Sequence, residues 1–343
     1  MAGVPQIGSE IRYAIKMQSV VGETLTATGA HEINIDKMTT PTPVKEIAIP
    51  ASTGAAGPTE DSFIYLTSGS ILGLSLSGPL DVYDDFILSQ CHFQKASEEA
   101  TAPFAKTFTP YTTHPADTAV KVFTLWEYYP ATGQCHVYRD CVVENYTNEG
   151  DIDGGDLVKR SVDIKALRVG YTEDVDAALS SWVNSGSAAG NEGGGYVHVN
   201  DLTATIDFGS GAVSVPLKAF SIKTGYDNAI GSYPDGAGGW NGYNITGQNG
   251  DYSITILKTD DNYVETALAS LKAGTPIDIT IEKGDGTAFL NYKDVVHGKI
   301  ASPDIKKDNA AAIRATFTGK ITKADASSDA RSHTVVDGED RGL

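Results

Sequence analysis

Three aspartates, Asp151, Asp153 and Asp156, lie close together in the stretch TNEGDIDGGDLVKRS, and their spacing resembles a calcium-binding loop. Such a loop needs oxygen ligands at regular positions and a closing bidentate carboxylate about six residues after its glycine. Here Leu157 to Arg160 follow the glycines instead. We therefore predict a tight turn between two strands, and keep a metal site as the less favoured alternative.

The cysteines offer a second set of possible ligands. Cys135 and Cys141 stand in the stretch CHVYRDC, whereas zinc ligands usually come as C-x2-C or C-x4-C pairs. Both have the same parity on a predicted strand, so we expect them to be buried on one face. With Cys91 they make an odd number and no disulfide framework, which is typical of a protein kept in a reducing cytoplasm. No metal and no cofactor is predicted.

The sequence shows no pattern typical of a catalytic site. The sequence contains no G-x-S-x-G elbow, and its histidines are scattered without a consistent carboxylate partner. The glycine-rich stretch DGAGGWNGYNITGQNG has Asn241 where a dinucleotide fingerprint needs its third glycine, and it precedes a strand. We predict no enzymatic activity. Tyr233, Trp240 and Tyr243 instead indicate a long loop that could adhere to a neighbouring subunit, with a solvent loop as the alternative.

Composition limits the class of protein. The 343 residues carry 44 acids and 26 bases, a net charge of −18, and no basic cluster that could grip phosphate. Specific nucleic-acid binding is therefore not expected. No apolar run approaches the roughly 18 residues of a membrane helix, and the first residues do not read as a secretory signal.

The elements that must position these residues are mainly strands. Apolar and β-branched residues alternate between turn signals in many segments, for example VFTLWEYY from Val122 and PIDITIEKG from Pro276. Only two segments have clear helical spacing: LDVYDDFILSQCHF from Leu80 and DDNYVETALASLKAG from Asp260.

An internal repeat relates the two halves of the chain. LSLSGPLDVYDDFI matches ITILKTDDNYVETA at an offset of 180 (263 − 83), and FTLWEYYPATGQCHVYRDCV matches IDITIEKGDGTAFLNYKDVV without a gap at 154 (292 − 138). Residues 159–167 match 313–321 out of phase, and a one-residue slip would restore their alternation. The first half carries an insertion of 26 residues (180 − 154), which we predict to be a loop.

This repeat predicts a mainly β protein with two tandem domains. We place the first domain at 1–172, a linker with a short helical turn at 173–195, and the second domain at 196–343. In the second half, the loop that matches the aspartate-rich turn contains Lys306 and Lys307, which would repel a cation.

The chain resembles the tail tube proteins of long-tailed bacteriophages, in the subset that carries two tandem tube domains. The resemblance rests on LDVYDDFILSQ, on the segment from Phe123 to Leu167, and on the order of elements in the weaker second half. It implies two β-sandwich or barrel domains, each with a short flanking helix. It also implies self-assembly into homotrimeric rings that mimic a hexamer and stack into a tube of the virion tail.

The resemblance further implies partners and a location. DNA and the tape measure protein would pass through the central channel without specific binding, during DNA ejection, and tail tip and terminator proteins would bind the ends of the tube. Assembly would take place in the host bacterial cytoplasm. Since phosphate is repelled by acids, we expect an acidic lumen with Asp163, Asp278 and Glu282 facing it. An outer-surface position for these residues is the alternative.

Two further expectations concern the ends of the chain and a competing function. The first 40 or so residues and the segment RSHTVVDGEDRGL have no clear place in the repeat, so we expect extended arms that reach neighbouring rings. The competing function is a carbohydrate-binding or adhesin-like β-sandwich of a phage spike or decoration protein, whose Tyr and Trp side chains would stack on sugars.

Overall fold

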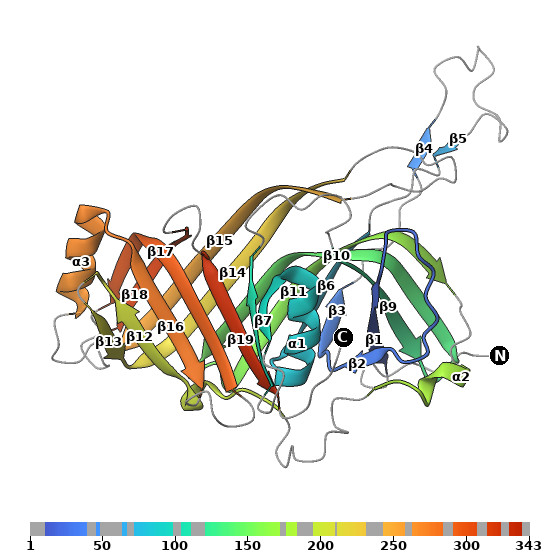
Figure 1. Cartoon of the computed structure of the whole chain (residues 1–343), viewed down its shortest axis with the longest axis horizontal. Coiled ribbons are helices and arrows are strands. Elements are labelled where there is room, and N and C mark those ends of the chain that lie inside the picture. Colours follow the sequence, from blue (N-terminus) through green and yellow to red (C-terminus); the bar gives the residue numbers. More distant parts are fainter. Residues whose placement is uncertain are drawn as a thin grey trace.

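The computed structural model describes residues 11–39, 46–48, 64–66, 72–98, 104–110, 121–171, 176–183, 195–209, 211–230, 243–257, 263–283, 291–306, 314–323 and 329–337. The described chain is mainly β and forms one large antiparallel sheet that closes on itself, with a separate two-stranded sheet (Figure 1). In the first half the elements are β1 Arg12–Gln18, β2 His31–Ile33, β3 Lys37–Thr39, β4 Glu46–Ala48, β5 Ile64–Leu66, β6 Leu72–Pro79, α1 Val82–His92, β7 Gln94–Glu98, β8 Phe104–Thr109, β9 Val122–Tyr129, β10 Gln134–Asp151, β11 Gly155–Tyr171 and α2 Asp176–Leu179. After a 3-10 turn at Val199–Asp201 follow β12 Thr203–Asp207, β13 Ala212–Val215, β14 Leu217–Ile230, β15 Tyr243–Leu257, α3 Tyr263–Ala273, β16 Ile277–Lys283, β17 Asn291–Lys306, β18 Arg314–Ile321 and β19 Arg331–Asp337.

Eight of these strands form one continuous run. In the first half the order is β3-β6-β11-β10, and in the second half it is β14-β15-β18-β17. The two groups of four are joined where β14 pairs with the second part of β10, from Asn145 opposite Gly225 to Asp151 opposite Ala219. We call this pairing the internal joint.

Six further strands form a second branch of the sheet, again in the same order in both halves. β2-β1-β9 continues onto the first part of β10, and β13-β12-β16 continues onto the first part of β17. The branches enclose one main core, to which both halves contribute, for example Leu125 and Ile279 from the second branch and Ile164 and Phe317 from the run of eight. The strand order is thus the same in both halves of the chain.

The expected strands and both helices are confirmed, and so is the turn at the three aspartates. Asp151 faces Gly155 across a β-hairpin, and the backbone N–H of Asp153 donates to Oδ1 of Asp151 at 2.9 Å. Gly155 has a φ of 130°, a backbone conformation open to glycine because it lacks a Cβ atom. The turn thus joins the two longest strands of the sheet.

The strand pairing confirms that residues 159–167 and 313–321 correspond to each other only after a shift of one residue. Leu74 pairs with Ile164 in the first half, and its counterpart Ile254 pairs with Phe317 in the second. Ile164 therefore corresponds to Phe317, and both are buried. A slip of one residue is needed because the core side of a strand alternates with every step.

The predicted match of residues 123–142 with residues 277–296, made without a gap at an offset of 154, is wrong for the strand that follows the hairpin connection. Leu125 pairs with Tyr138, whereas its counterpart Ile279 pairs with Val296 and not with Tyr292. The hairpin ends explain the shift, because Tyr129 faces Gln134, five residues on, and Lys283 faces Tyr292, nine residues on. The second connection is four residues longer (9 − 5), and loops accept such length at little cost.

The expectation that Cys135 and Cys141 share a face is also wrong. Both are buried, but Cys135 packs beside Trp126 in a small second core, while Cys141 belongs to the main core. A β-bulge between Tyr138 and Cys141, where Asp140 has a φ of 53°, adds a residue and reverses the parity of β10.

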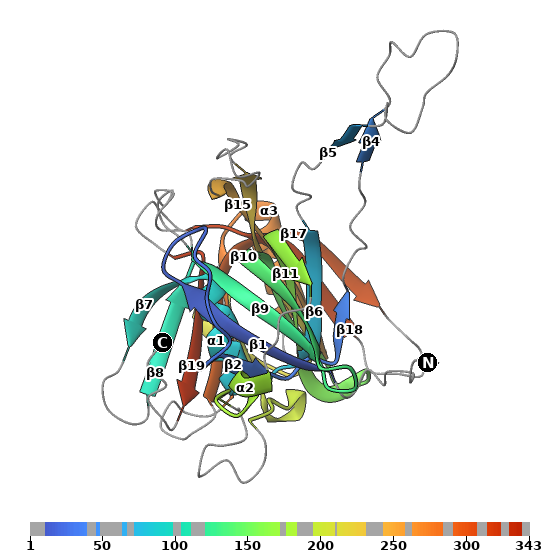
Figure 2. The ribbon, with the colours of Figure 1, turned by 90° about the vertical axis from the view of Figure 1, so that its right-hand side faces the viewer.

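The segments expected to be arms or a loop are parts of the sheet instead. Every residue of β1, from Arg12 to Gln18, pairs with β9, and β19 pairs with both β17 and β8. The 26-residue insertion contributes the β7–β8 hairpin, which therefore links the halves a second time. Among the described strands, only β4 and β5 stand away from the main sheet, as Figure 2 shows. Residues 1–10 and 338–343 lie outside the described residues.

The predicted linker is partly packed on the first half. Its helical turn is confirmed as α2, and Trp182 just beyond it is buried in the second core. The backbone of Val183 exchanges hydrogen bonds with Ala30 and Glu32 at 2.9 Å each. Residues 184–194 lie outside the described residues. In the part of the chain that the structure describes, no helix has the length and apolar character needed to cross a membrane.

Candidate functional site

The run of eight strands has one apolar and one polar side. Leu76, Val162, Ile222 and Phe317 are among the side chains that point into the core. The residues between them point to the opposite side of the sheet and lie beside one another on neighbouring strands. One such row consists of Ser77, Ser161, Thr147, Lys223, Asp251, Lys320 and Lys299. We call this side, from β3 to β17, the polar face. Two hollows of about 360 Å³ each open on it.

The polar face is close to neutral, in contrast to the chain as a whole. Among the side chains that the structure describes, its charged positions are seven bases and five acids: Lys37, Lys159, Lys165, Lys223, Lys299, Arg314 and Lys320 with Glu149, Asp151, Asp163, Asp251 and Asp304. Lys320 pairs with Asp251, and Lys165 pairs with Glu144 at the bulge of β10. Since the whole chain has 44 acids and 26 bases, its acidic excess lies elsewhere.

The structure does not bring the three predicted lumen acids together. Asp163 lies on the polar face, where its Oδ2 accepts a hydrogen bond from Nδ2 of Asn145 at 3.0 Å. Asp278 and Glu282 lie on β16, which pairs with β12 and the first part of β17. Their partners are His297 at 2.6 Å and Lys293 at 2.9 Å. Those two acids belong to the second branch of the sheet.

The predicted adhesive loop is described only at its end. Tyr233 and Trp240 lie outside the described residues. Tyr243 begins β15 and pairs with Ile230, the last residue of β14. Tyr243 is therefore placed at the distal end of the long β14–β15 hairpin.

The carboxylates of the aspartate-rich turn bind protein groups. Asp153 pairs with Lys218 and with Arg314, the latter at 3.3 Å, and these cations lower its pKa, Lys218 most. Asp156 pairs with His198 at 2.9 Å, and that hydrogen bond is the main cause of its lowered pKa. Among the residues that the structure describes, no group of three or more His, Cys, Asp and Glu side chains is arranged to hold a metal ion.

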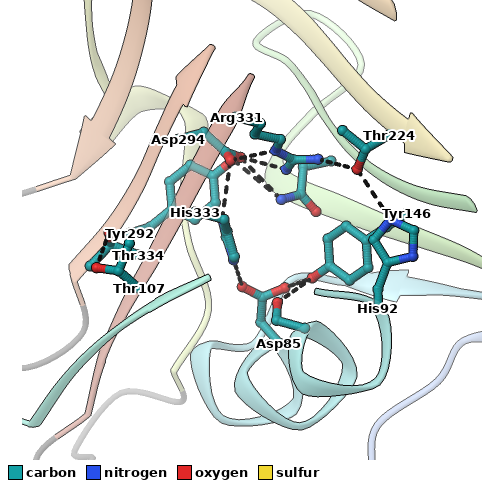
Figure 3. Close-up of polar contacts among 12 residues, drawn as sticks. Asp85, His92, Thr107, Tyr146, Thr224, Tyr292, Asp294, Arg331, His333 and Thr334 are labelled. Atoms are coloured by element: carbon teal, nitrogen blue, oxygen red, sulfur yellow. Dashed lines mark hydrogen bonds and ion pairs between the residues drawn. The ribbon is translucent and has the colours of Figure 1, made fainter. Parts of the chain in front are cut away.

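A buried network of charged and polar groups lies where the two halves meet (Figure 3). Its charged members, Asp85, Asp294, Arg331 and His333, have fully buried side chains and come from α1, β17 and β19. We call it the buried charge cluster. Sequence reasoning missed it, because its parts lie as far apart as 248 residues in the chain.

Asp294 is at the centre of the cluster. Nε and one terminal nitrogen of Arg331 donate to its two oxygens at 2.8 and 2.9 Å, a bidentate geometry that suits guanidinium and carboxylate. The hydroxyl of Tyr292 donates to Oδ2 at 2.5 Å, and Nδ2 of Asn148 donates to the same oxygen at 3.2 Å. Burial alone would raise the pKa of Asp294, but Arg331 and His333 outweigh it and hold that pKa well below the usual range.

His333 bridges the two acids. Its Nδ1 is 3.2 Å from Asp294 Oδ1, and its Nε2 is 2.7 Å from Asp85 Oδ2. Burial would lower the pKa of the imidazole, but the two carboxylates outweigh this effect and raise it to about 9. His333 is therefore protonated at neutral pH. The hydroxyl of Tyr146 on β10 donates to the other oxygen of Asp85.

A second histidine in this region is kept neutral. Nε2 of His92 lies 3.3 Å from Oγ1 of Thr224, which also accepts a hydrogen bond from Arg331 at 3.0 Å. Burial is the main cause that lowers the pKa of His92 to about 3. His92 on α1 thus reaches β14, on the other side of the internal joint (Figure 3).

The buried charge cluster is arranged to hold elements of the two halves together. Each charged group is enclosed by side chains and satisfied by its neighbours, and the contacts run from α1 and β10 of the first half to β14, β17 and β19 of the second. Removing any one member would leave a buried charge without its partner, which is costly. The cluster therefore fixes the two halves of the sheet against each other.

The chain was compared with known protein families and with curated proteins. No family model matches it, and neither does any curated protein.

Proposed function

We propose that this chain is the major tail tube subunit of a long-tailed bacteriophage, a structural protein and not an enzyme. The observation that supports it best is the repeated strand order across the internal joint, β3-β6-β11-β10 followed by β14-β15-β18-β17. A subunit that presents two equivalent groups of four strands side by side is suited to a ring with twice as many repeats as chains. In this proposal the halves are two tandem tube domains.

Three such chains would form a ring that mimics a hexamer, and rings would stack into a tube. Joining sheets edge to edge removes exposed strand edges, which otherwise invite aggregation. The polar face would then line the channel through which DNA and the tape measure protein pass. Tail tip and terminator proteins would contact the tube ends in the virion tail.

The nearly neutral charge of the polar face changes the charge that we propose for the wall of the channel. Asp163 remains a lumen-facing residue in this proposal, whereas Asp278 and Glu282 would lie on the outer branch of the ring. Lysines on the polar face are balanced by neighbouring acids such as Asp251. DNA would therefore slide along a serine- and threonine-rich, nearly neutral wall that neither grips nor strongly repels phosphate.

Negative-stain electron microscopy of the purified protein at rising concentration tests this function. Rings or hollow tubes with threefold or pseudo-sixfold symmetry are expected. Single particles at every concentration, together with a specific shift on a glycan array, would contradict the tube and favour the carbohydrate-binding alternative.

A further inference from the structure

Three buried polar atoms that have no hydrogen-bond partner among the described residues lie beside the buried charge cluster. They are Oδ1 of Asp84 on α1, Oδ1 of Asn148 on β10 and Nη1 of Arg160 on β11. At most 2% of each of these residues is exposed. Leaving a buried donor or acceptor unsatisfied costs free energy, and nearly all such groups in folded proteins have a partner in the chain or in ordered water. The three atoms therefore indicate a partner that the described chain does not supply.

The strand pairing brings two of the three atoms together. Asn148 lies directly opposite Arg160, and both side chains point to the core side of the sheet. Opposed residues of this kind have Cβ atoms about 4.5–5.5 Å apart. The orientation of the Asn148 amide is fixed by its Nδ2, which donates to the carboxylate of Asp294 at 3.2 Å, since a carboxylate can only accept. Oδ1 is therefore the atom of Asn148 that remains for another partner.

Asp84 reaches the same region from α1, which packs on β10. Its Oδ2 accepts a hydrogen bond from the backbone N–H of Asn34 at 2.8 Å, which leaves Oδ1. Burial is the main cause that raises the pKa of Asp84 to about 7, and the charge of Arg160 is the largest factor that opposes this rise. The guanidinium is therefore close to the carboxylate, although Nη1 does not donate to it directly. A water molecule commonly lies between polar groups at such a separation.

The donors and acceptors of the three atoms match a single water molecule. Asp84 and Asn148 offer one oxygen acceptor each, and Arg160 offers an N–H donor. Water donates two hydrogen bonds and also accepts, so one molecule satisfies all three atoms, and a buried water typically makes about three hydrogen bonds. A metal cation would be repelled by the guanidinium, and an anion by the two oxygens. Either kind of ion therefore fits this set of partners less well than water.

We propose that one ordered water molecule binds between Asp84, Asn148 and Arg160 and is part of the folded structure. This water site is independent of the tube function. The water bridges the carboxylate of Asp84 and the guanidinium of Arg160, which do not meet directly. Because Asn148 also donates to Asp294, the water extends the network of the buried charge cluster to the first turn of α1. It thereby links α1 to β17 in the second half.

A crystal structure of the full chain at about 2 Å resolution or better tests the proposal, because ordered internal waters are visible there. One density peak is expected about 2.6–3.2 Å from Oδ1 of Asp84, Oδ1 of Asn148 and Nη1 of Arg160. Absence of that peak, for example because Arg160 donates directly to one of the two oxygens, would overturn the water site. Crystals grown in rubidium bromide are the control for ions. Anomalous scattering at the same position would identify a bound ion and would also overturn the water site.

Two substitutions of Asp84 test its role as a partner of the water. Asp84→Leu removes the acceptor, and its crystal structure should lack the peak. Asp84→Asn is the matched control, because it keeps a polar group in the same place, and its structure should retain the peak. A peak that persists unchanged in Asp84→Leu would contradict the proposed set of partners. If Asp84→Leu does not fold, the wild-type structure alone decides.

Discussion

Arg331 contributes to stability mainly by neutralising Asp294. Both side chains are fully buried, so removing the guanidinium leaves a carboxylate without water and without its strongest partner. We expect Arg331→Met to reduce the free energy of unfolding by about 3–5 kcal/mol. Arg314→Met is the matched control, since Arg314 is 44% exposed in its ion pair with Asp153, and should cost about 0–1 kcal/mol. Urea titration followed by circular dichroism measures both, and equal losses would contradict the role assigned to the cluster.

His333 should make stability fall as the solution becomes alkaline. Its pKa is raised from 6.5 in the unfolded chain to about 9 in the fold, so its contribution is complete below pH 6.5 and is lost as the pH rises through 9. Asp85, Asp294, Arg331, Tyr146 and Tyr292 are the titratable groups that face it.

The measurement compares the urea midpoint at pH 6.5 and at pH 9 for the wild type and for His333→Gln. The wild type should lose more stability over this interval than the variant, which has no proton to release. His92 does not interfere, because its lowered pKa makes its contribution disappear only as the pH falls below 6.5. A variant with the same pH dependence as the wild type would show that His333 is not charged in the fold.

Local pattern predicted which residues face the core, but not which residues meet across it. The alternation in PIDITIEKG puts Ile277, Ile279 and Ile281 on one face of a strand, and all three are buried. The contact of Asp85 with His333 gives no local signal, because it depends on the pairing of β19 with β17 and β8. The face on which Cys141 lies could not be predicted, because a bulge of β10 shifts the alternation by one residue. Asp140 in this bulge accepts hydrogen bonds from Gln18 and Arg168 of other strands.

At the scale of elements, glycines allow the strands of the second half to approach closely. A Cβ atom on Gly319 of β18 would meet the carbonyl oxygen of Lys299 and the hydroxyl of Tyr252. Gly73 on β6 is in open space, with nothing within 4 Å of such an atom.

We therefore expect substitution by alanine to destabilise the protein at Gly319 and to be nearly neutral at Gly73. Gly319→Ala should destabilise the protein by about 1–3 kcal/mol, because neither the backbone of β17 nor the ring of Tyr252 can move away freely. Gly73→Ala should change stability by no more than about 0.5 kcal/mol. Thermal unfolding of both variants decides it, and an unchanged melting temperature for Gly319→Ala would show that β17 and β18 are not so closely packed.

Strands and helices were predictable because their signals are local. β9 has the bounds expected from VFTLWEYY, and α1 and α3 lie where the helical spacing placed them. The β7–β8 hairpin was not predicted, because its stability comes from pairing with β19, more than 200 residues later. The same reason explains why the sequence pattern of residues 331–337 does not reveal that they form a strand of the main sheet. Strand edges find partners by long-range geometry that a sequence window does not contain.

At the scale of the whole molecule, the two halves should unfold together. They share one main core, the internal joint, the β8–β19 pairing and the buried charge cluster. We expect a single urea transition, with coincident midpoints from tryptophan fluorescence and far-ultraviolet circular dichroism. In a Trp240→Phe variant the two remaining tryptophans, Trp126 and Trp182, lie in the small core of the first half, so fluorescence reports that half while circular dichroism reports both. Two separated transitions would show that the halves are independent domains.

The distance in sequence between Asp85 and His333 has a consequence for synthesis on the ribosome. Asp85 is made 248 residues before the imidazole that neutralises it, and Arg331 follows Asp294 only 37 residues later. While β19 has not yet left the ribosome, Asp85 and Asp294 lack their partners His333 and Arg331 and are costly to bury. The first half therefore cannot complete its fold before β19 is available. We expect stalled chains to resist protease only once residues beyond Asp337 have left the exit tunnel, and resistance before that point would disprove this order. Completion of the subunit, and with it any association with other copies, is thereby postponed until β19 has been made and has left the ribosome.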